Sequence, residues 1–265
     1  MKVLLTGANG FIGSHVAKVL ARHGHEVSPA ATACDVAIHL AWYVEPGKYL
    51  ESPLNDQCRD DSLALVKSVQ CRRWVVVGTS FEYASSTQPL REDSPTGPRT
   101  RYARCKLELF QALQQLRVEL AWPRLFYLYG PGEDARRFVP SVINALLEGR
   151  PAPLTAGEEV RDYLHVEDVA EAIVAVATST LTGAVNIASG QPVTVRDVAT
   201  KIAGIIGRPE LLQFGAYQAA ATDEPHVVAD VTKLSAIWRP RVGLEDGLAG
   251  TIEWWRQAQS ARSGR

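Results

Sequence analysis

Short apolar runs that resemble strands alternate with helical repeats along most of the chain. An apolar run at residues 3–5 leads into a glycine-rich turn at residues 6–11, and apolar residues then recur at helical spacing as far as Leu20. The same patterns predict strands at residues 25–28, 35–41, 74–78, 120–128 and 184–188, and helices at residues 60–69, 101–116, 138–147, 166–177, 195–206 and 248–257. Such alternation is typical of an α/β fold with a doubly wound parallel sheet.

Composition narrows the class of protein. With 265 residues, 46% of them apolar, the chain can bury a sizeable core. A net charge of −1 and a pI near 6.6 provide no general field for nucleic acid or an anionic membrane, and no apolar run approaches the length of a membrane span. We therefore expect no nucleic-acid partner and no membrane partner.

The four cysteines lack the spacing of a metal site. No C-x-x-C pair occurs, and no histidine stands near a cysteine at a metal-ligand distance in the sequence, so we predict no metal. Reduced thiols favour a cytoplasmic location. The residues are Cys34, Cys58, Cys71 and Cys105.

The glycine-rich turn is the first candidate site. Gly7, Gly10 and Gly13 stand at G-x-x-G-x-x-G spacing between a strand and a helix, where missing Cβ atoms allow a tight turn and close approach of a phosphate. The free N–H groups of the helix N-terminus can then bind a pyrophosphate. The pattern predicts a dinucleotide site.

Three later residues could perform proton chemistry. Tyr102 and Lys106 are four residues apart on a predicted helix and so share one face. A nearby ammonium stabilises a phenolate, so we expect Lys106 to lower the pKa of Tyr102 and make it a general acid or base. Thr79 ends a predicted strand, where ligands of a doubly wound sheet bind.

Together these motifs resemble the extended short-chain dehydrogenase/reductase family, which modifies nucleotide sugars. The resemblance extends over nearly the whole chain and rests on TGANGFIG (6–13), HLA (39–41), TSFEY (79–83), YARCK (102–106), RLFYLYGPG (124–132), RDYLHVEDVAEAI (161–173) and NIASG (186–190). It implies a Rossmann-like doubly wound parallel sheet with a smaller C-terminal substrate-binding cap. Residues 1–126 and about 161–190 would form the dinucleotide-binding domain, and residues 127–160 and about 191–265 the substrate-binding domain.

The resemblance also implies ligands and roles. The cofactor would be NAD or NADP, the substrate a nucleotide sugar, and the assembly a homodimer formed by the helix that carries Tyr102 and the helix near residues 60–70. Phe110, Leu113 and Leu116 could supply the dimer face or belong to the core. The implied catalytic residues are Thr79, Tyr102 and Lys106; the implied cofactor-binding residues are Gly7, Asn9, Gly10, Phe11, Ile12, Gly13, Leu40, Ala41, Tyr102 and Lys106; the implied substrate-binding residues are Ser80, Phe81, Tyr127 and Arg161.

The residues after Thr79 narrow the reaction. Dehydratases of the family carry Asp-Glu there, whereas this chain has Ser80 and Phe81, neither of which can perform that acid–base chemistry. A 4-ketoreductase of nucleotide-activated deoxysugars is the leading interpretation. A nucleotide-sugar 4-epimerase remains an alternative, and so does a non-catalytic nucleotide-binding scaffold that lost its adenine site.

The chain departs from the family pattern at several positions. Tyr127 replaces a frequent Asn, and Ala220 occupies the place of a second diphosphate-binding arginine. Ala31 stands where an acidic residue usually binds the adenosine ribose. Since a parallel crossover needs a dozen or more residues, the few residues before the strand at 35–41 leave no room for the usual helix and third strand. We expect the sheet to lack an edge strand and its covering helix.

Overall fold

The computed structural model describes residues 1–28, 30, 32–218 and 223–263. Ala31 and Ala220 lie outside the described residues. The strands are β1 (Lys2–Thr6), β2 (Glu26–Ser28), β3 (Ala33–His39), β4 (Gln70–Val76), β5 (Gly78–Thr79), β6 (Glu119–Leu125), β7 (Tyr127–Tyr129), β8 (Ala152–Pro153), β9 (Val160–His165), β10 (Gly183–Ile187), β11 (Pro192–Thr194), β12 (Leu212–Gln213) and β13 (His226–Val227). The helices are α1 (Phe11–Arg22), α2 (Leu54–Ser68), the 3-10 helix η1 (Ser80–Glu82), α3 (Arg101–Gln114), α4 (Phe138–Leu147), α5 (Val166–Thr178), α6 (Val195–Ile206), the 3-10 helix η2 (Pro209–Leu211), α7 (Thr232–Ser235) and α8 (Leu244–Ser263).

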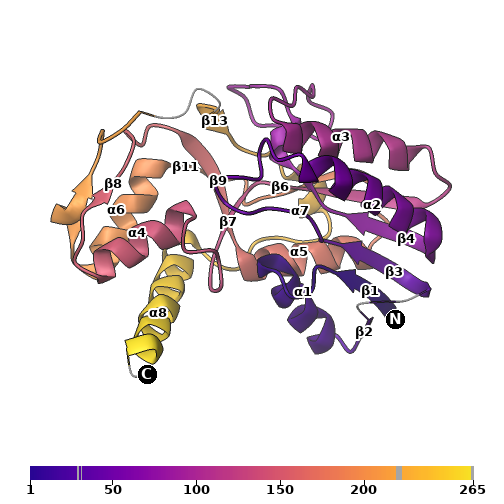
Figure 1. The fold of residues 1–265 in the computed structure, drawn as a ribbon, viewed down its shortest axis with the longest axis horizontal. Coiled ribbons are helices and arrows are strands. Elements are labelled where there is room, and N and C mark those ends of the chain that lie inside the picture. The colour runs from indigo at the N-terminus through magenta and orange to yellow at the C-terminus, as the bar shows by residue number, and fades with distance from the viewer. Residues whose placement is uncertain (29, 31, 219–222, 264–265) are drawn as a thin grey trace.

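A parallel sheet of seven strands forms the larger half of the molecule (Figure 1). Its strand order is β10-β6-β4-β3-β1-β2, with the short strand β5 also paired to β6, and every recorded pairing is parallel. The strand order reverses beside β1, because β2 lies on one side of it and β3 on the other. The predicted doubly wound α/β fold is confirmed.

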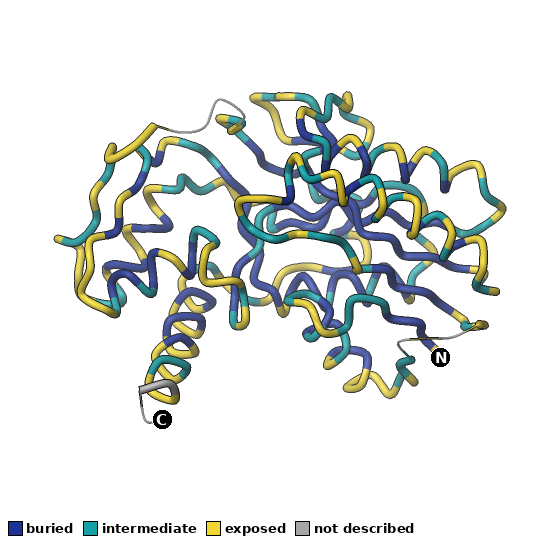
Figure 2. The backbone as a smooth tube through the Cα atoms, in the orientation of Figure 1, coloured by how far each residue is buried: buried dark blue, intermediate teal, exposed yellow. Residues whose placement is uncertain are grey.

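Helices cover both faces of this sheet. The side chains of β1 show the alternation, because Val3 and Leu5 pack with α1 and α5, whereas Leu4 packs with α2 and α3. Each central strand therefore presents apolar residues to two cores, which is why these strands read as continuous apolar runs. The buried strands lie between the two helical layers (Figure 2).

The sheet is short on the β2 side. Only residues 29–32 separate β2 from β3, and β2 itself has three residues. Among the described residues no strand lies beyond β2, and no helix stands between β2 and β3. In the described part of the chain the sheet therefore ends at β2, in agreement with the short link before β3.

A second unit lies at the other end of the molecule. The segment predicted as one strand at residues 120–128 is in fact two strands, because β6 belongs to the large sheet and β7 pairs with β9 in a sheet with β11 and β13. Residue 161 lies within β9 of this second sheet, whereas α5 and β10, which follow, belong to the large-sheet half. The helices α4, α6 and α8 pack together there around a separate core (Figure 1).

α2 and α3 each differ from the expectation in one respect. α2 begins at Leu54 rather than near residue 60, since its first turns follow Pro53 and are polar, without the apolar repeat that the prediction used. On α3, Leu113 is fully buried and Phe110 stacks on Trp122, so both belong to the core and not to a free dimer face. In the part of the chain that the structure describes, no helix is long and apolar enough to cross a membrane.

Candidate active site

The glycine-rich turn joins β1 to α1 in a form that suits a pyrophosphate. Gly7 has a φ of +72°, which favours glycine, and a Cβ on Gly13 would overlap the carbonyl oxygen of Gly7. Gly10 precedes α1 and has no side chain that could cap the helix. The first N–H groups of α1 therefore receive no hydrogen-bond acceptor from the residue at the N-cap. The turn therefore fits the phosphates of a dinucleotide.

A cavity of about 740 Å³ lies at the carboxyl ends of the large sheet and brings most of the predicted residues together. The predicted residues that line it are Gly7, Gly10, Phe11, Ile12, Gly13, Leu40, Ala41, Thr79, Ser80, Phe81, Tyr102, Lys106 and Tyr127. Asn9 is exposed and is not among the described residues that line the cavity. The cavity is large enough for a small organic ligand.

Tyr102 stands in a cluster of aromatic rings in this cavity. Its ring makes edge contacts with Tyr49 at 5.0 Å and Phe81 at 6.5 Å between centroids. Burial raises the pKa of Tyr102, the Tyr49 phenol adds to that shift, and a hydrogen bond with Thr79 opposes it. The phenol is therefore protonated at neutral pH, as a general acid must be before it acts.

Lys106 is buried in the wall of the same cavity. Its Nζ atom donates a hydrogen bond of 2.7 Å to the Val77 carbonyl and lies 3.7 Å from the centre of the Trp42 ring. Burial lowers the pKa of Lys106 to about 7. Contrary to the prediction that Lys106 lowers the pKa of Tyr102, that pKa is raised, because burial is the largest influence on the phenol.

Thr79 is fixed by a buried ion pair. It precedes η1, its hydroxyl accepts from the Phe81 N–H at 3.3 Å, and its own N–H donates to Glu82 at 2.9 Å. Glu82 is fully buried and also accepts from Arg124 Nε at 2.8 Å and from the indole of Trp122. Burial raises the pKa of Glu82, and Arg124 opposes that shift. The sequence reasoning did not single out Glu82 or Arg124, which hold Thr79 at the cavity.

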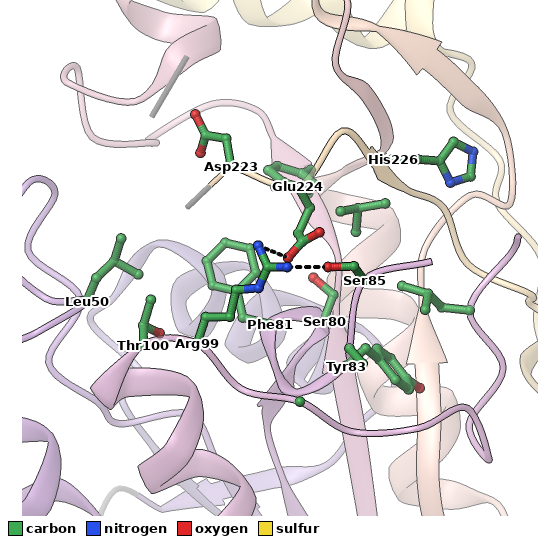
Figure 3. A pocket seen from close by; sticks show the side chains of 15 residues that line it. Leu50, Ser80, Phe81, Tyr83, Ser85, Arg99, Thr100, Asp223, Glu224 and His226 are labelled. Carbon is green, nitrogen blue, oxygen red and sulfur yellow. Dashed lines mark hydrogen bonds and ion pairs between the residues drawn. The ribbon is translucent and has the colours of Figure 1, made fainter. Parts of the chain in front are cut away.

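A second cavity of about 80 Å³ adjoins the first, and Ser80, Phe81 and Tyr127 line both. Figure 3 shows Arg99 reaching across it to Ser85 and Glu224. Arg161 lines neither cavity among the described residues. Its guanidinium donates to the carbonyls of Val160 and Glu224 and lies 5.0 Å over the Tyr127 ring. The structure therefore places Arg161 behind Tyr127.

The large cavity is also lined by residues that the sequence reasoning missed, among them Trp42, Tyr49, Glu133 and Arg137. Two of these had a signal in the sequence, because Trp42 directly follows the HLA motif and Glu133 directly follows the Y-G-P-G turn. The guanidinium of Arg137 lies 5.0 Å over the Tyr49 ring and donates to the Val44 carbonyl. Glu133 and Arg137 bring one acidic and one basic group to the same ligand space.

His39, the last residue of β3, has the contacts of a structural histidine. One ring nitrogen lies 2.6 Å from the Thr6 hydroxyl and the other 2.8 Å from the Ser62 hydroxyl. Burial lowers the pKa of His39 to about 3, with Lys106 adding to the shift, so the ring is neutral. The described residues contain no group of acidic, histidine and cysteine side chains that could hold a metal ion.

Comparison with known families gives one match that extends over more than half of the chain. The profile described as "NAD dependent epimerase/dehydratase family" matches residues 3–33 and 29–188. The two matched segments meet at residues 29–33, in the link between β2 and β3. The break in the match thus coincides with the place where the sheet is shortened.

Individual relatives catalyse different reactions. UDP-glucuronic acid decarboxylase 1 of Xenopus tropicalis is 25% identical over 307 residues, which cover 97% of this chain and 72% of the relative. A solved NAD-dependent NDP-hexosamine 5,6-dehydratase of tunicamycin biosynthesis is 27% identical with a TM-score of 0.85, covering 97% of this chain and 98% of the other. UDP-glucose 4-epimerase of Thermus thermophilus, solved with NAD, is 25% identical with a TM-score of 0.86, covering 97% and 100%.

Proposed function

Because the chain belongs to the NAD-dependent epimerase/dehydratase family, whose members modify nucleotide sugars, we propose that it reduces a 4-keto-6-deoxysugar carried on a nucleoside diphosphate. The observation that carries this proposal is the convergence of Thr79, Tyr102 and Lys106 on one cavity. Ser80 and Phe81 line the cavity beside them and supply no acid–base group for dehydration. These contacts favour a simple reduction at one carbon.

The cofactor is NAD or NADP, as the family description and the NAD complex of the Thermus thermophilus relative support. When bound, it supplies the hydride. Gly7, Gly10 and Gly13 would hold its pyrophosphate, and Tyr102 and Lys106 its nicotinamide end.

Each catalytic side chain has a separate task in this proposal. The protonated Tyr102 phenol donates its proton to the sugar carbonyl oxygen, and the Thr79 hydroxyl orients that oxygen. Lys106, with its pKa near neutrality, can be charged when the phenol gives up its proton and so stabilises the phenolate. The rings of Trp42, Tyr49 and Phe81 pack around Tyr102 and bury it.

The substrate would lie between the two sheets. Ser80, Phe81 and Tyr127 line both cavities and are placed to contact the sugar and its nucleotide. For the diphosphate, Arg137 is better placed than Arg161, because Arg137 lines the large cavity and Arg161 does not. The second sheet, with α4, α6 and α8, would form the substrate-binding unit. A homodimer and a cytoplasmic location remain predictions.

A 4-epimerase is the second candidate, since the Thermus thermophilus relative is one and the same three residues serve oxidation followed by reduction. A non-catalytic scaffold is disfavoured, because it would not need a buried lysine and a protonated phenol at one cavity.

Two measurements test this proposal. Fluorescence titration with NADH and NADPH should show binding well below millimolar concentration, and dTDP-4-keto-6-deoxyglucose should then oxidise the bound cofactor with net loss of its absorbance. Interconversion of UDP-glucose and UDP-galactose without net consumption of cofactor would instead establish the epimerase. Absence of binding by both NADH and NADPH would rule out both enzymes.

A further inference from the structure

Glu133 lines the large cavity, and one of its carboxyl oxygens is buried without a hydrogen-bond partner among the described residues. The side chain is half-buried, its Oε2 atom is fully buried, and no residue that the structure describes makes a hydrogen bond to that atom. A buried polar atom without a partner is costly, so native proteins rarely retain one without a reason. The unpartnered oxygen disfavours the ionised carboxylate, and because Glu133 lines the cavity, the neutral acid stands beside the space that a ligand would occupy.

The loop that carries Glu133 packs against the first turns of α1. The Pro131 carbonyl accepts a hydrogen bond of 3.1 Å from His15, and Gly132 stands beside the Phe11 ring. Both Phe11 and Gly10, at the open N-terminus of α1, line the same cavity as Glu133. The loop is thus adjacent to the part of the cavity that fits a pyrophosphate.

Two arginines that follow Glu133 in the chain also suit an anionic ligand. Arg136 and Arg137 both line the cavity, and Arg136 is paired with Asp134 at 2.8 Å. The titratable or charged groups around Glu133 come from its own segment and from the elements packed against it. Its own segment supplies Asp134, Arg136 and Arg137. The neighbouring elements supply Tyr163 and His165 from β9, His15 from α1, and Glu45 and Tyr49 from the segment after β3.

We propose that Glu133 binds a diphosphate ligand as a neutral carboxylic acid, donating a hydrogen bond to a phosphate oxygen. A phosphate oxygen only accepts hydrogen bonds, so it satisfies the protonated form of Glu133 and repels the ionised form. This inference rests on the proposed function for the nature of the ligand. The diphosphate could be that of the dinucleotide or that of the nucleotide sugar, since both would occupy this cavity.

The protonation state required by this contact is the one that the site favours. Burial raises the pKa of Glu133 to about 8, Arg137 opposes the shift, and Asp134 adds to it. The carboxyl is therefore protonated at neutral pH and ionises above about pH 8. Ligand binding should favour the protonated form further, so that binding near pH 8 takes up a proton.

The experiment compares wild type with Glu133→Gln, which keeps a hydrogen-bond donor but cannot ionise. Dissociation constants are measured by calorimetry for NADH, UDP-glucose and dTDP-glucose at about pH 7 and pH 9. In the wild type we expect at least one of these ligands to bind about tenfold more weakly at pH 9 than at pH 7, because about one tenth of Glu133 is then protonated. In Glu133→Gln the difference attributable to Glu133 should disappear, together with the proton uptake seen in buffers of different protonation enthalpy.

A matched control comes from the same loop. Hydrogen bonds from Arg136 lower the pKa of Asp134 to about 2, so Asp134→Asn removes a group that is ionised throughout. The pH dependence of binding should persist in this variant, with its midpoint at a somewhat lower pH, because the Asp134 charge no longer raises the pKa of Glu133. Loss of pH dependence for NADH alone would identify the cofactor diphosphate, and loss for a sugar nucleotide alone would identify the substrate diphosphate.

Two outcomes would overturn the inference. If wild type and Glu133→Gln show the same pH dependence and proton uptake for every ligand, Glu133 does not bind a diphosphate, although the proposed enzyme stands. If the folded wild type binds none of the three ligands at about pH 7, this inference and the proposed function both fail.

Discussion

Two glutamates beside the large cavity have opposite environments. Glu82, beneath Thr79, is fully buried and accepts hydrogen bonds from Thr79 N–H, Trp122 and Arg124. Glu133, in the loop after β7, lines the cavity and has one buried carboxyl oxygen to which no described residue makes a hydrogen bond. The comparison distinguishes a carboxylate that the protein uses to fix its own backbone from a carboxyl group that we propose binds a ligand.

The largest expected effect lies on the paired side. Glu82→Ala would leave the buried Arg124 without its carboxylate, and we expect a loss of roughly 3–5 kcal/mol in the free energy of unfolding. Urea denaturation followed by circular dichroism measures it. Glu133→Ala is the matched variant and should change stability by less than about 1 kcal/mol. Equal losses in the two variants would contradict the distinction.

The next effect concerns Tyr102, which makes a hydrogen bond with Thr79. Tyr102→Phe removes the proposed proton donor and should reduce turnover by roughly 10²- to 10³-fold while NADH affinity changes little. Steady-state rates and fluorescence titration separate the two quantities. Tyr49→Phe, whose ring contacts Tyr102 without a proposed proton transfer, serves as control. An active Tyr102→Phe enzyme would reject the assignment.

The third prediction concerns Lys106, a lysine of the same cavity whose charged form is disfavoured by burial. Burial lowers the pKa of Lys106 from 10.5 to about 7, so between these pH values the unfolded chain holds a proton that the folded protein lacks. The free energy of unfolding should therefore rise with pH across this window, by up to about 1.4 kcal/mol per pH unit from this group. Urea denaturation at several pH values measures this slope. Lys106→Met should remove that contribution, and the exposed Lys67→Met should retain it.

The smallest expected effect concerns a residue that the sequence assigned to the cofactor. Asn9 is exposed and does not line the cavity among the described residues, so Asn9→Ala should alter NADH affinity by less than about threefold. A larger loss in a fluorescence titration would restore its predicted role. The NADH affinity of Glu133→Gln, measured at the same pH, gives the comparison. It shows whether Glu133 contributes more to NADH binding than the exposed Asn9 of the glycine-rich turn.

The sequence by itself determined the large sheet and most of the site. The central strands of that sheet contain short runs of apolar residues, and most of the long helices have an apolar repeat, so local patterns sufficed for these elements. The extents of α4 and α6 were predicted as observed. Gly7, Tyr102 and Lys106 were identified because motif spacing reflects contacts within one turn or one helix. The short link before β3 likewise excluded an additional edge strand.

Only the tertiary structure decided how distant groups meet. The sequence of β6 and β7 was interpreted as a single strand, and their separation depends on β10 and β9, which lie far along the chain. Two further contacts also join distant segments. Glu82 pairs with Arg124, and Arg161 packs over the Tyr127 ring. The protonation states of Tyr102 and Lys106 depend on burial, which no spacing encodes. For that reason the sequence identified the pair Tyr102 and Lys106 but gave the wrong direction for the pKa shift of Tyr102.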